Sequence, residues 1–348
     1  MKKALLLIGI CLLFACNNDI HQGYHITVNF KAPEPKINIK KIVPLETTKS
    51  SLYGSFFRVC ISENYIYIQD MQQVLVFDLT GQYLSKIHAI GSGPQEYIAI
   101  SQFWVFDDEI YITASEKKAI LVYAPTGQYL RTIPLDFSPN AVAVTPDYMA
   151  FKSTYNPNGT LIITDRQGTK KYETVKPVLA SVTVSIPAVF SFIESKRQLY
   201  YFPDFSSDIY SIGPSATDVK KIGIDFGEHA ILPEYIASLT QNDMMERLKK
   251  DEIMRFPALY MAGPWWGMTF YIGEMQYAWY YNTENKQQRI TASKGNRAVK
   301  PIAAASHDLF VKTVEAAEFL RSPEYATFRD SISVQDDDNA LLVFYSVN

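Results

Sequence analysis

The chain has 348 residues, 47% of them hydrophobic, and a formal net charge of −3. Its length allows one to three domains and a large core. The near-neutral charge and the lack of any basic run argue against a nucleic-acid partner, because phosphate binding depends on clustered Lys and Arg. The 23 Tyr and 20 Phe favour β-strands, where aromatic side chains pack well on a pleated surface.

The first 16 residues have the pattern of a targeting segment. Two lysines precede an apolar run over residues 4–15, which is too short to span a bilayer as a helix. The run ends in Leu-Phe-Ala-Cys, which resembles the lipobox of bacterial lipoproteins, where the cysteine becomes the lipidated first residue. We therefore predict a lipoprotein signal peptide over residues 1–16, with lipidation at Cys16. The alternative is a plain secretory signal with an incidental cysteine.

A polar stretch follows Cys16. We predict residues 17–36 to be a tether that holds the folded domain off the membrane. The protein is then expected in the cell envelope, at the outer membrane, with the membrane as a partner through the lipid anchor; the side of the membrane is left open. Cys60 is the only other cysteine after the signal, so no internal disulfide can form, and we expect it to be a small core residue.

A strand–turn–strand unit recurs along the rest of the chain. Its first copy, over residues 65–87, contains Tyr-Ile-Tyr-Ile, Val-Leu-Val-Phe, the turn Asp-Leu-Thr-Gly and Tyr-Leu-Ser-Lys-Ile. The second copy, over residues 110–133, has the turn Ala-Pro-Thr-Gly. Asp at the first turn position can accept from the backbone two residues later, and Gly at the last accepts a positive φ. Later copies have turns starting at residues 165, 213 and 282, and the last copy ends the chain.

The spacing of the turns indicates a propeller. The first four turns start 46, 41 and 48 residues apart, which is the length of a four-stranded blade. The next intervals, of 69 and 66 residues, contain helical patterns at 233–254 and at 314–330, the second interrupted at Pro323. We therefore predict an all-β fold: a six-bladed β-propeller with two short helical insertions, as a single domain over residues 37–348.

The two ends of this domain complement each other. The sixth unit stops where its outer strand is due, and the strand-like segment at 37–43 has no partner of its own. We predict that this N-terminal strand completes the last blade and closes the ring, because an open ring would expose two ladder edges.

With these features, residues 37–348 resemble the six-bladed β-propeller lipoproteins common in gut bacteria, which are similar in build to NHL-repeat propellers. Four segments carry the resemblance: Val-Pro-Leu-Glu-Thr at 43–47, Gly-Ser-Gly-Pro-Gln-Glu-Tyr at 91–97, Ile-Asp-Phe-Gly at 224–227 and Asp-Asn-Ala-Leu-Leu-Val at 338–343. Gln95 stands where the family commonly has Gly, and Ala340 where it commonly has Pro. The resemblance implies the fold and an envelope location, and no catalytic residue, because the family has no established activity.

The glycine-rich loop at 91–97 is the first candidate for ligand binding. It is expected between two blades, where its glycines permit a tight path. In the functional interpretation it presents Glu96 and Tyr97 at a face of the ring, where the carboxylate meets a sugar hydroxyl or a cation. No helix follows the loop, so it offers no helix N-terminus to a phosphate.

The aromatic stretch at 256–281 is the second candidate. Trp265 and Trp266 face opposite sides if their strand is regular, so both cannot enter one core. One of them could be an exposed platform for a sugar ring or an apolar partner. The alternative is that the pair fills space between blades or covers the neighbouring helix.

Signatures of catalysis are missing from the sequence. The five histidines lack metal-ligand spacing, and no Gly-x-Ser-x-Gly elbow occurs. We predict no catalytic set, no metal site and no cofactor, although a channel site gathered from several blades would not be visible in this way.

The leading hypothesis is a cell-envelope protein that acts as a binding or scaffold propeller for a glycan, peptide or protein partner. The alternative is a propeller hydrolase or lyase with a site in the central channel, where three or more Asp, Glu, Asn or His side chains would converge. A third hypothesis is a structural accessory of an outer-membrane complex.

Overall fold

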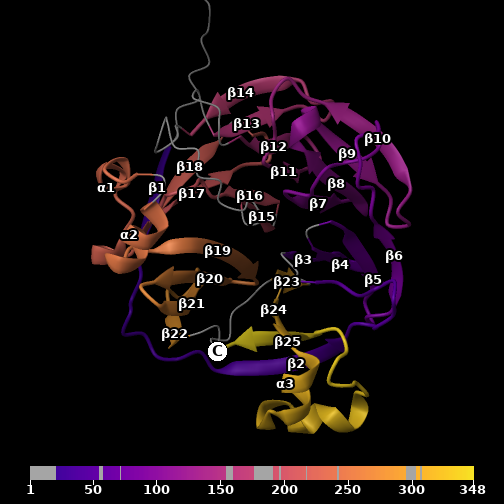
Figure 1. The fold of residues 1–348 in the computed structure, drawn as a ribbon. Coiled ribbons are helices and arrows are strands. Elements are labelled where there is room, and N and C mark those ends of the chain that lie inside the picture. The colour runs from indigo at the N-terminus through magenta and orange to yellow at the C-terminus, as the bar shows by residue number, and fades with distance from the viewer. Residues whose placement is uncertain are drawn as a thin grey trace, which may run out of the picture.

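The computed structural model describes residues 21–54, 58–70, 72–153, 160–175, 191–195, 197–216, 218–240, 243–294, 303–305 and 308–348. Six antiparallel sheets stand side by side around an axis (Figure 1), so the predicted six-bladed β-propeller is confirmed. Each sheet has four antiparallel strands, and the fourth has one additional strand in parallel.

Apart from β1 and β2, the strands of each blade follow each other outward from the axis in chain order. The first blade has β3 (Arg58–Ile61), β4 (Tyr65–Gln69), β5 (Val74–Asp78) and β6 (Tyr83–Ile87). The second has β7 (Phe103–Phe106), β8 (Glu109–Ala114), β9 (Ala119–Tyr123) and β10 (Tyr129–Pro134). The third has β11 (Ala141–Val144), β12 (Met149–Lys152), β13 (Leu161–Thr164) and β14 (Lys170–Thr174).

The fourth blade has β15 (Phe192–Ser195), β16 (Gln198–Tyr201), β17 (Asp208–Ile212) and β18 (Val219–Asp225), with β1 (His21–Thr27) outside them. The fifth has β19 (Arg255–Ala262), β20 (Trp265–Ile272), β21 (Met275–Asn282) and β22 (Gln288–Lys294). The sixth has β23 (Ala303–Ala305), β24 (Leu309–Val314), β25 (Leu341–Val347) and β2 (Ile37–Pro44).

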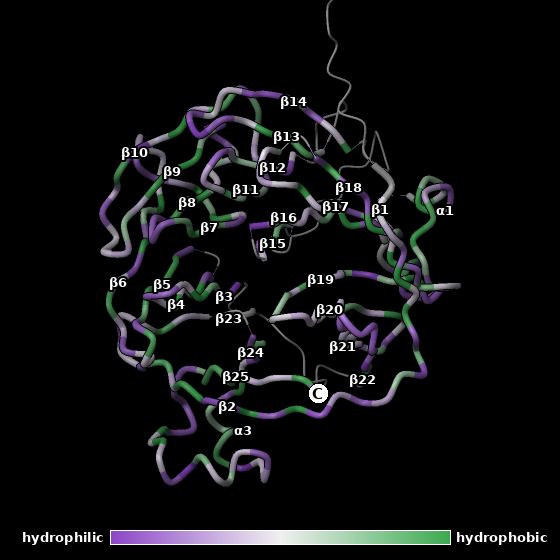
Figure 2. The backbone as a smooth tube through the Cα atoms, turned by 180° about the vertical axis from the view of Figure 1, so that it is seen from behind, coloured by the Kyte–Doolittle hydropathy of each residue, from purple (hydrophilic) through white to green (hydrophobic). Residues whose placement is uncertain are grey.

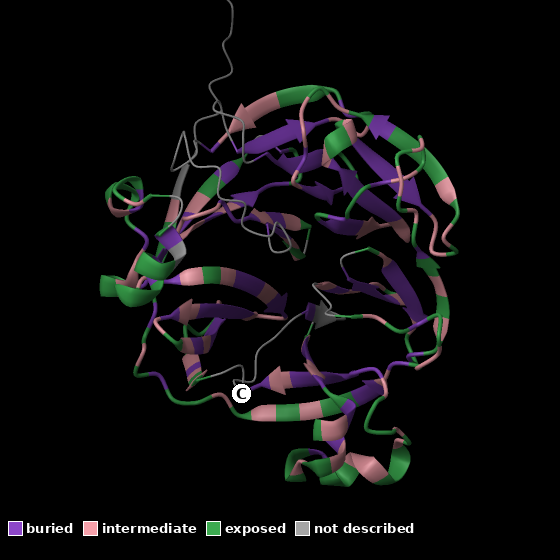
Figure 3. Cartoon of the chain, viewed as in Figure 1, coloured by how far each residue is buried: buried purple, intermediate pink, exposed green. Residues whose placement is uncertain are grey.

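The apolar core lies between the blades. The middle strands are buried on both faces, as in β5, where the first four side chains are fully buried. In the outer strand β6 the first four positions alternate between half-buried and exposed, and only the last is buried. Figure 3 shows this difference between the purple middle strands and the green and pink outer strands. A strand covered on both faces needs a continuous apolar run, which is why the repeat shows Val-Leu-Val-Phe rather than alternation.

The predicted turn chemistry is confirmed. In the first blade, Oδ1 of Asp78 accepts from the backbone N–H of Thr80 at 2.8 Å and of Gln82 at 3.0 Å, and Gly81 has φ +90°. Asp165 repeats this in the third blade with the N–H groups two and four residues later. The aspartate side chains accept hydrogen bonds within the turn itself, so a few neighbouring residues are enough to predict the turn.

The ring closes through the N-terminal strand, as predicted. β2 pairs antiparallel with β25, from Ile37 opposite Val347 to Pro44 opposite Leu341. The first and last parts of the domain are therefore joined in one sheet.

The prediction of a free tether over residues 17–36 differs from the structure from residue 21 onward. β1 pairs in parallel with β18, and residues 28–36 follow the outer strand of blade five, where Pro33 O accepts from Ile290 N at 3.1 Å. We call residues 21–44 the N-terminal belt; its path outside blades four to six is visible in Figure 2. The alternation of Ile26, Val28 and Phe30 is a strand signal that the polar composition obscured.

Both helical insertions are present but are shorter than their sequence patterns. The first contains η3 (Gly227–His229), α1 (Pro233–Ala237) and α2 (Met244–Lys250), and the second contains α3 (Ala316–Arg321) and η4 (Pro323–Ser331); η1 (Ser115–Lys117) lies in blade two. Thr240 N donates to Oδ1 of Asp243 at 3.0 Å, so a local side-chain turn competes with one continuous first helix.

Candidate functional site

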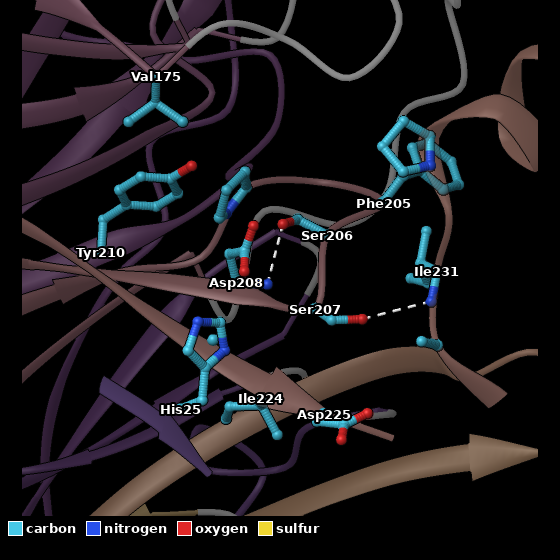
Figure 4. A pocket seen from close by; sticks show the side chains of 14 residues that line it. His25, Val175, Phe205, Ser206, Ser207, Asp208, Tyr210, Ile224, Asp225 and Ile231 are labelled. Carbon is cyan, nitrogen blue, oxygen red and sulfur yellow. Dashed lines mark hydrogen bonds between the residues drawn. The ribbon is translucent and has the colours of Figure 1, made fainter. Parts of the chain in front are cut away.

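A pocket of about 340 Å³ lies at the outer part of blade four. Its walls come from β1, β17 and β18, the 203–207 loop, the segment 230–233 and Val175 at the end of blade three. Figure 4 shows the side chains of His25, Asp208 and Tyr210 on one side, and Phe205 and Ile231 on the other. We call this the blade-four pocket; its volume is at the small end of ligand sites.

The N-terminal belt builds one wall of this pocket. β1 places His25 opposite Gly223 of β18, and a Cβ at Gly223 would lie only 2.2 Å from Nδ1 of His25. The missing side chain at Gly223 therefore allows the imidazole to pack directly on the strand backbone.

Two carboxylates line the pocket. Oδ2 of Asp208 lies 2.7 Å from Nζ of Lys221. Oδ1 of Asp225 accepts from the N–H of Gly227 at 2.8 Å, and its Oδ2 accepts from Oγ1 of Thr27 at 3.3 Å. A carboxylate has about four acceptor positions, so both groups keep acceptor capacity.

Two serine hydroxyls supply donors beside them. Oγ of Ser206 accepts from the N–H of Asp208 at 3.0 Å, and Oγ of Ser207 accepts from the N–H of Ile231 at 3.3 Å. A hydroxyl that accepts a hydrogen bond through its oxygen can also donate one through its proton, so both serines suit a ligand that accepts. Figure 4 shows both bonds as dashed lines.

Tyr210 and Phe205 add ring surface to the pocket. Burial, and secondly the charge of Asp208, raises the pKa of Tyr210 to about 12, so its hydroxyl is protonated at neutral pH. Phe205 and Val175 both have left-handed backbone, with φ of +52° and +61°. This conformation is uncommon for aromatic and β-branched residues and costs free energy, so the surrounding packing must hold these two walls in place.

The chemistry of the pocket favours binding of polar, uncharged groups. The carboxylates can accept hydrogen bonds from ligand hydroxyls, and the hydroxyls of the two serines and Tyr210 can donate them. Phe205 and Ile231 offer apolar surface. Two carboxylates beside one lysine repel anions. Among the residues that the structure describes, no group of three His, Cys, Asp or Glu side chains is arranged to hold a metal ion.

The structure places Glu96 and Tyr97 in the inter-blade loop rather than in this pocket. Oε2 of Glu96 accepts from Gly93 N at 2.7 Å, and a Cβ at Gly91 would lie 2.0 Å from the same oxygen. Tyr97 is fully buried, and its hydroxyl donates to Gln72 O at 3.0 Å. The glycines therefore make room for the Glu96 carboxylate, and both side chains have structural roles here.

The two tryptophans face opposite sides of β20, as expected. Trp266 is only 4% exposed and contacts Tyr200 and Tyr281 edge-on, between blades four and five. Trp265 is half-buried and packs toward the cluster between blades five and six. The alternative in which the pair fills space between blades thus describes their positions, and the Trp266 ring is not an exposed platform.

Cys16 lies outside the described residues, and Cys60 is half-buried against the cluster between blades one and two.

The sequence did not single out the blade-four pocket, although its Asp225 is part of the Ile-Asp-Phe-Gly segment. The other lining residues come from four separate stretches of chain, which only the folded ring brings together.

The inner strands place a guanidinium among aromatic rings. The Arg58 guanidinium carbon lies 5.6 Å from the ring centroid of Phe103 and 5.4 Å from that of Trp104. Burial lowers the pKa of Arg58, and the nearby Cys60 and Tyr260 oppose this. These inner-strand side chains are cationic and aromatic, which differs from the acidic set that a calcium-dependent channel enzyme would need.

Two of the four segments that carry the family resemblance, 43–47 and 338–343, meet where the ring closes. Nδ2 of Asn339 donates to Glu46 O at 2.9 Å and to Ser51 O at 3.1 Å, and Asn339 N donates to Oγ1 of Thr47 at 2.8 Å. A more open hollow of about 480 Å³ lies beside this junction. The segments at 43–47 and 338–343 thus have a structural role.

A family model described as "Domain of unknown function (DUF4934)" matches residues 38–346. The chain belongs to the DUF4934 family. The match covers the ring from β2 to β25 and leaves out β1. No curated protein matches the chain.

Two solved structures are similar to this DUF4934 propeller. One is a protein from Bacteroides fragilis that is named as exported, with a TM-score of 0.77, 15% identity, and coverage of 93% of this chain and 99% of that one. The other is a member of the DUF4221 family from Bacteroides vulgatus, with a TM-score of 0.57, 12% identity, and coverage of 91% and 99%. At these identities the likeness concerns the fold. Within the described residues, the helices are all too short or too polar to cross a bilayer.

Proposed function

We propose that this protein is an exported, lipid-anchored propeller of the cell envelope that binds a neutral, hydroxyl-rich ligand, a glycan segment, in the blade-four pocket. The observation that carries the proposal is the set of side chains there: two carboxylates, two serine hydroxyls and one protonated tyrosine around apolar surface. Each ligand hydroxyl both donates and accepts, so such a set satisfies it from both directions.

Export and anchoring have their own support. The first 16 residues have the lysine flank, the apolar run and the terminal cysteine of a lipoprotein signal, and the similar protein from Bacteroides fragilis is named as exported. The expected location is the outer membrane, with Cys16 carrying the lipid. The mass of the mature N-terminal peptide tests this directly: an acylated Cys16 supports the anchor, and an unmodified cysteine contradicts it.

The ligand proposal is tested with the full-length protein, extracted from membranes in detergent, on an array of neutral and charged glycans. Hits are then measured by calorimetry for wild type, Asp208→Asn and Asp225→Asn, with Asp147→Asn as the matched control. Asp147 is exposed on blade three, outside the pocket. Loss of a charge-assisted hydrogen bond should weaken binding about ten- to a hundredfold in the two pocket variants and leave the control unchanged.

Because Asp208→Asn also breaks the ion pair with Lys221, Ser206→Ala provides a second variant without a charge change. Binding of neutral glycans that is equal in wild type and all pocket variants would place the site elsewhere. If the protein binds amines more tightly than sugars, and both aspartate variants lose this preference, the ligand is a cation rather than a glycan. No binding of any neutral glycan would refute the proposal.

A further inference from the structure

The belt makes the connection between the proposed anchor and the ring short. β1 begins at His21, so only residues 17–20 separate the first strand from Cys16. Five steps from Cα to Cα span at most about 18 Å when fully extended. A tether reaching to residue 36, as the composition suggested, would have been several times longer.

We propose that in the anchored protein the outer edge of blade four, formed by β1 and β18, faces the lipid bilayer and lies against its surface. This inference rests on lipidation of Cys16, which belongs to the proposed function. The partner of this edge is the membrane itself, and the opposite side of the ring, blade one, points away from it. Figure 1 shows β1 and β6 on opposite sides of the ring.

β1 is held firmly enough to keep the connection short. Ile26 and Val28 are 3% and 5% exposed, in the cluster that joins blades four and five. Beyond β1, Asn29 N donates to Oε1 of Gln288 at 2.8 Å, and Nε2 of Gln288 donates to Thr27 O at 3.0 Å. The belt then continues into β2, so detachment of β1 would also disturb the strand that closes the ring.

The surface of this edge suits lipid headgroups. Tyr24, on β1, is 46% exposed, and it lies only eight residues after Cys16. Tyrosine is favoured at membrane–water interfaces because its ring is apolar and its hydroxyl is polar. The lysines of the adjacent strand are balanced by acids, with Lys220 at 2.9 Å from Asp218 and Lys221 at 2.7 Å from Asp208. Contact should therefore depend little on salt or on anionic lipid.

The short connection also limits what reaches this side of the ring. A small folded domain is about 30 Å across, more than the greatest distance between His21 and the anchor. Folded protein partners must therefore approach from the other blades, whereas a saccharide still fits beside blade four.

The test compares two matched labels on the full-length, lipidated protein in phosphatidylcholine vesicles. A fluorophore is attached at Lys220→Cys on blade four or at Lys86→Cys on blade one, both exposed, in a Cys60→Ser background. Energy transfer to a headgroup-labelled acceptor lipid should be several-fold stronger at position 220 than at position 86. It should be unchanged in high salt or with anionic lipid.

A Gly/Ser insertion of about 20 residues after Asn18 is the control for reach. Such a linker has a root-mean-square span of about 25 Å, so the difference between the two labels should largely vanish. Equal transfer at both positions in the lipidated protein without the insertion would overturn the inference while leaving the anchor intact. A mass spectrum without acyl chains on Cys16 would instead overturn the anchor, and the inference with it.

Discussion

Removal of the closing strand β2 should destroy the cooperative fold. The comparison is between a chain that starts at residue 37 and one that starts at residue 44. Both lack the outer part of the belt, and they differ only in the segment that pairs with β25. This isolates ring closure from the contribution of β1.

The size of the effect follows from the β2 contacts. Ile42 and Val43 are 7% and 1% exposed, so each side chain contributes about 1.5–3 kcal/mol through burial. The removed residues include six positions of β2 that are paired with β25, and each ladder hydrogen bond contributes about 0.5–1.5 kcal/mol. Together these contributions are comparable to the about 5–15 kcal/mol stability of a typical domain.

The assay is guanidinium unfolding followed by tryptophan fluorescence and far-ultraviolet circular dichroism. The chain from residue 37 should unfold in one coincident transition, and the chain from residue 44 should show no cooperative transition. Ile42→Ala gives a graded version, with an expected loss of about 2–5 kcal/mol, against less than about 0.5 kcal/mol for the exposed Lys40→Ala. Equal midpoints for the two truncated chains would refute the closure argument.

Three further predictions concern stability. Asp204→Ala should lower the stability by about 3–5 kcal/mol, because the 3%-exposed Lys152 ammonium, 2.5 Å from Asp204, then has no ion-pair partner there. The double variant with Lys152→Met should recover most of this loss. Equal unfolding midpoints for the single and double variants would contradict the argument. Gly81→Ala should lower the urea midpoint clearly more than Gly54→Ala, because at φ +90° its Cβ would lie 2.0 Å from Pro44 O, whereas Gly54 has open space. The Arg131 guanidinium holds the pKa of Glu109 below its ordinary 4.5, so this carboxylate stabilises the fold above pH 4.5, and the stabilisation is lost as the pH falls through the pKa of the folded state. In denaturant titrations, Glu109→Gln should therefore lose less stability on acidification than wild type. An unchanged pH profile would argue against the ion pair.

The candidate site was less predictable than the fold. The pocket joins side chains such as His25, Asp208 and Asp225 that lie up to 200 residues apart, and nothing local marks them as neighbours. The tryptophan pair was conspicuous in sequence, but whether an aromatic ring is a platform or filling depends on what packs over it. Here Tyr200, Tyr281 and the exposed Tyr24 surround Trp266.

The sequence by itself determined the features that arise within a few residues: the Asp-x-x-Gly turns, the apolar runs of the middle strands and the spacing of the blades. It also determined ring closure, because an unpaired strand at one end matched a missing strand at the other. Only the tertiary structure decided the path of residues 21–36. Parallel pairing of β1 with β18 depends on a partner about 200 residues away, and a strand at the rim of a sheet buries few side chains, so its local pattern stays weak.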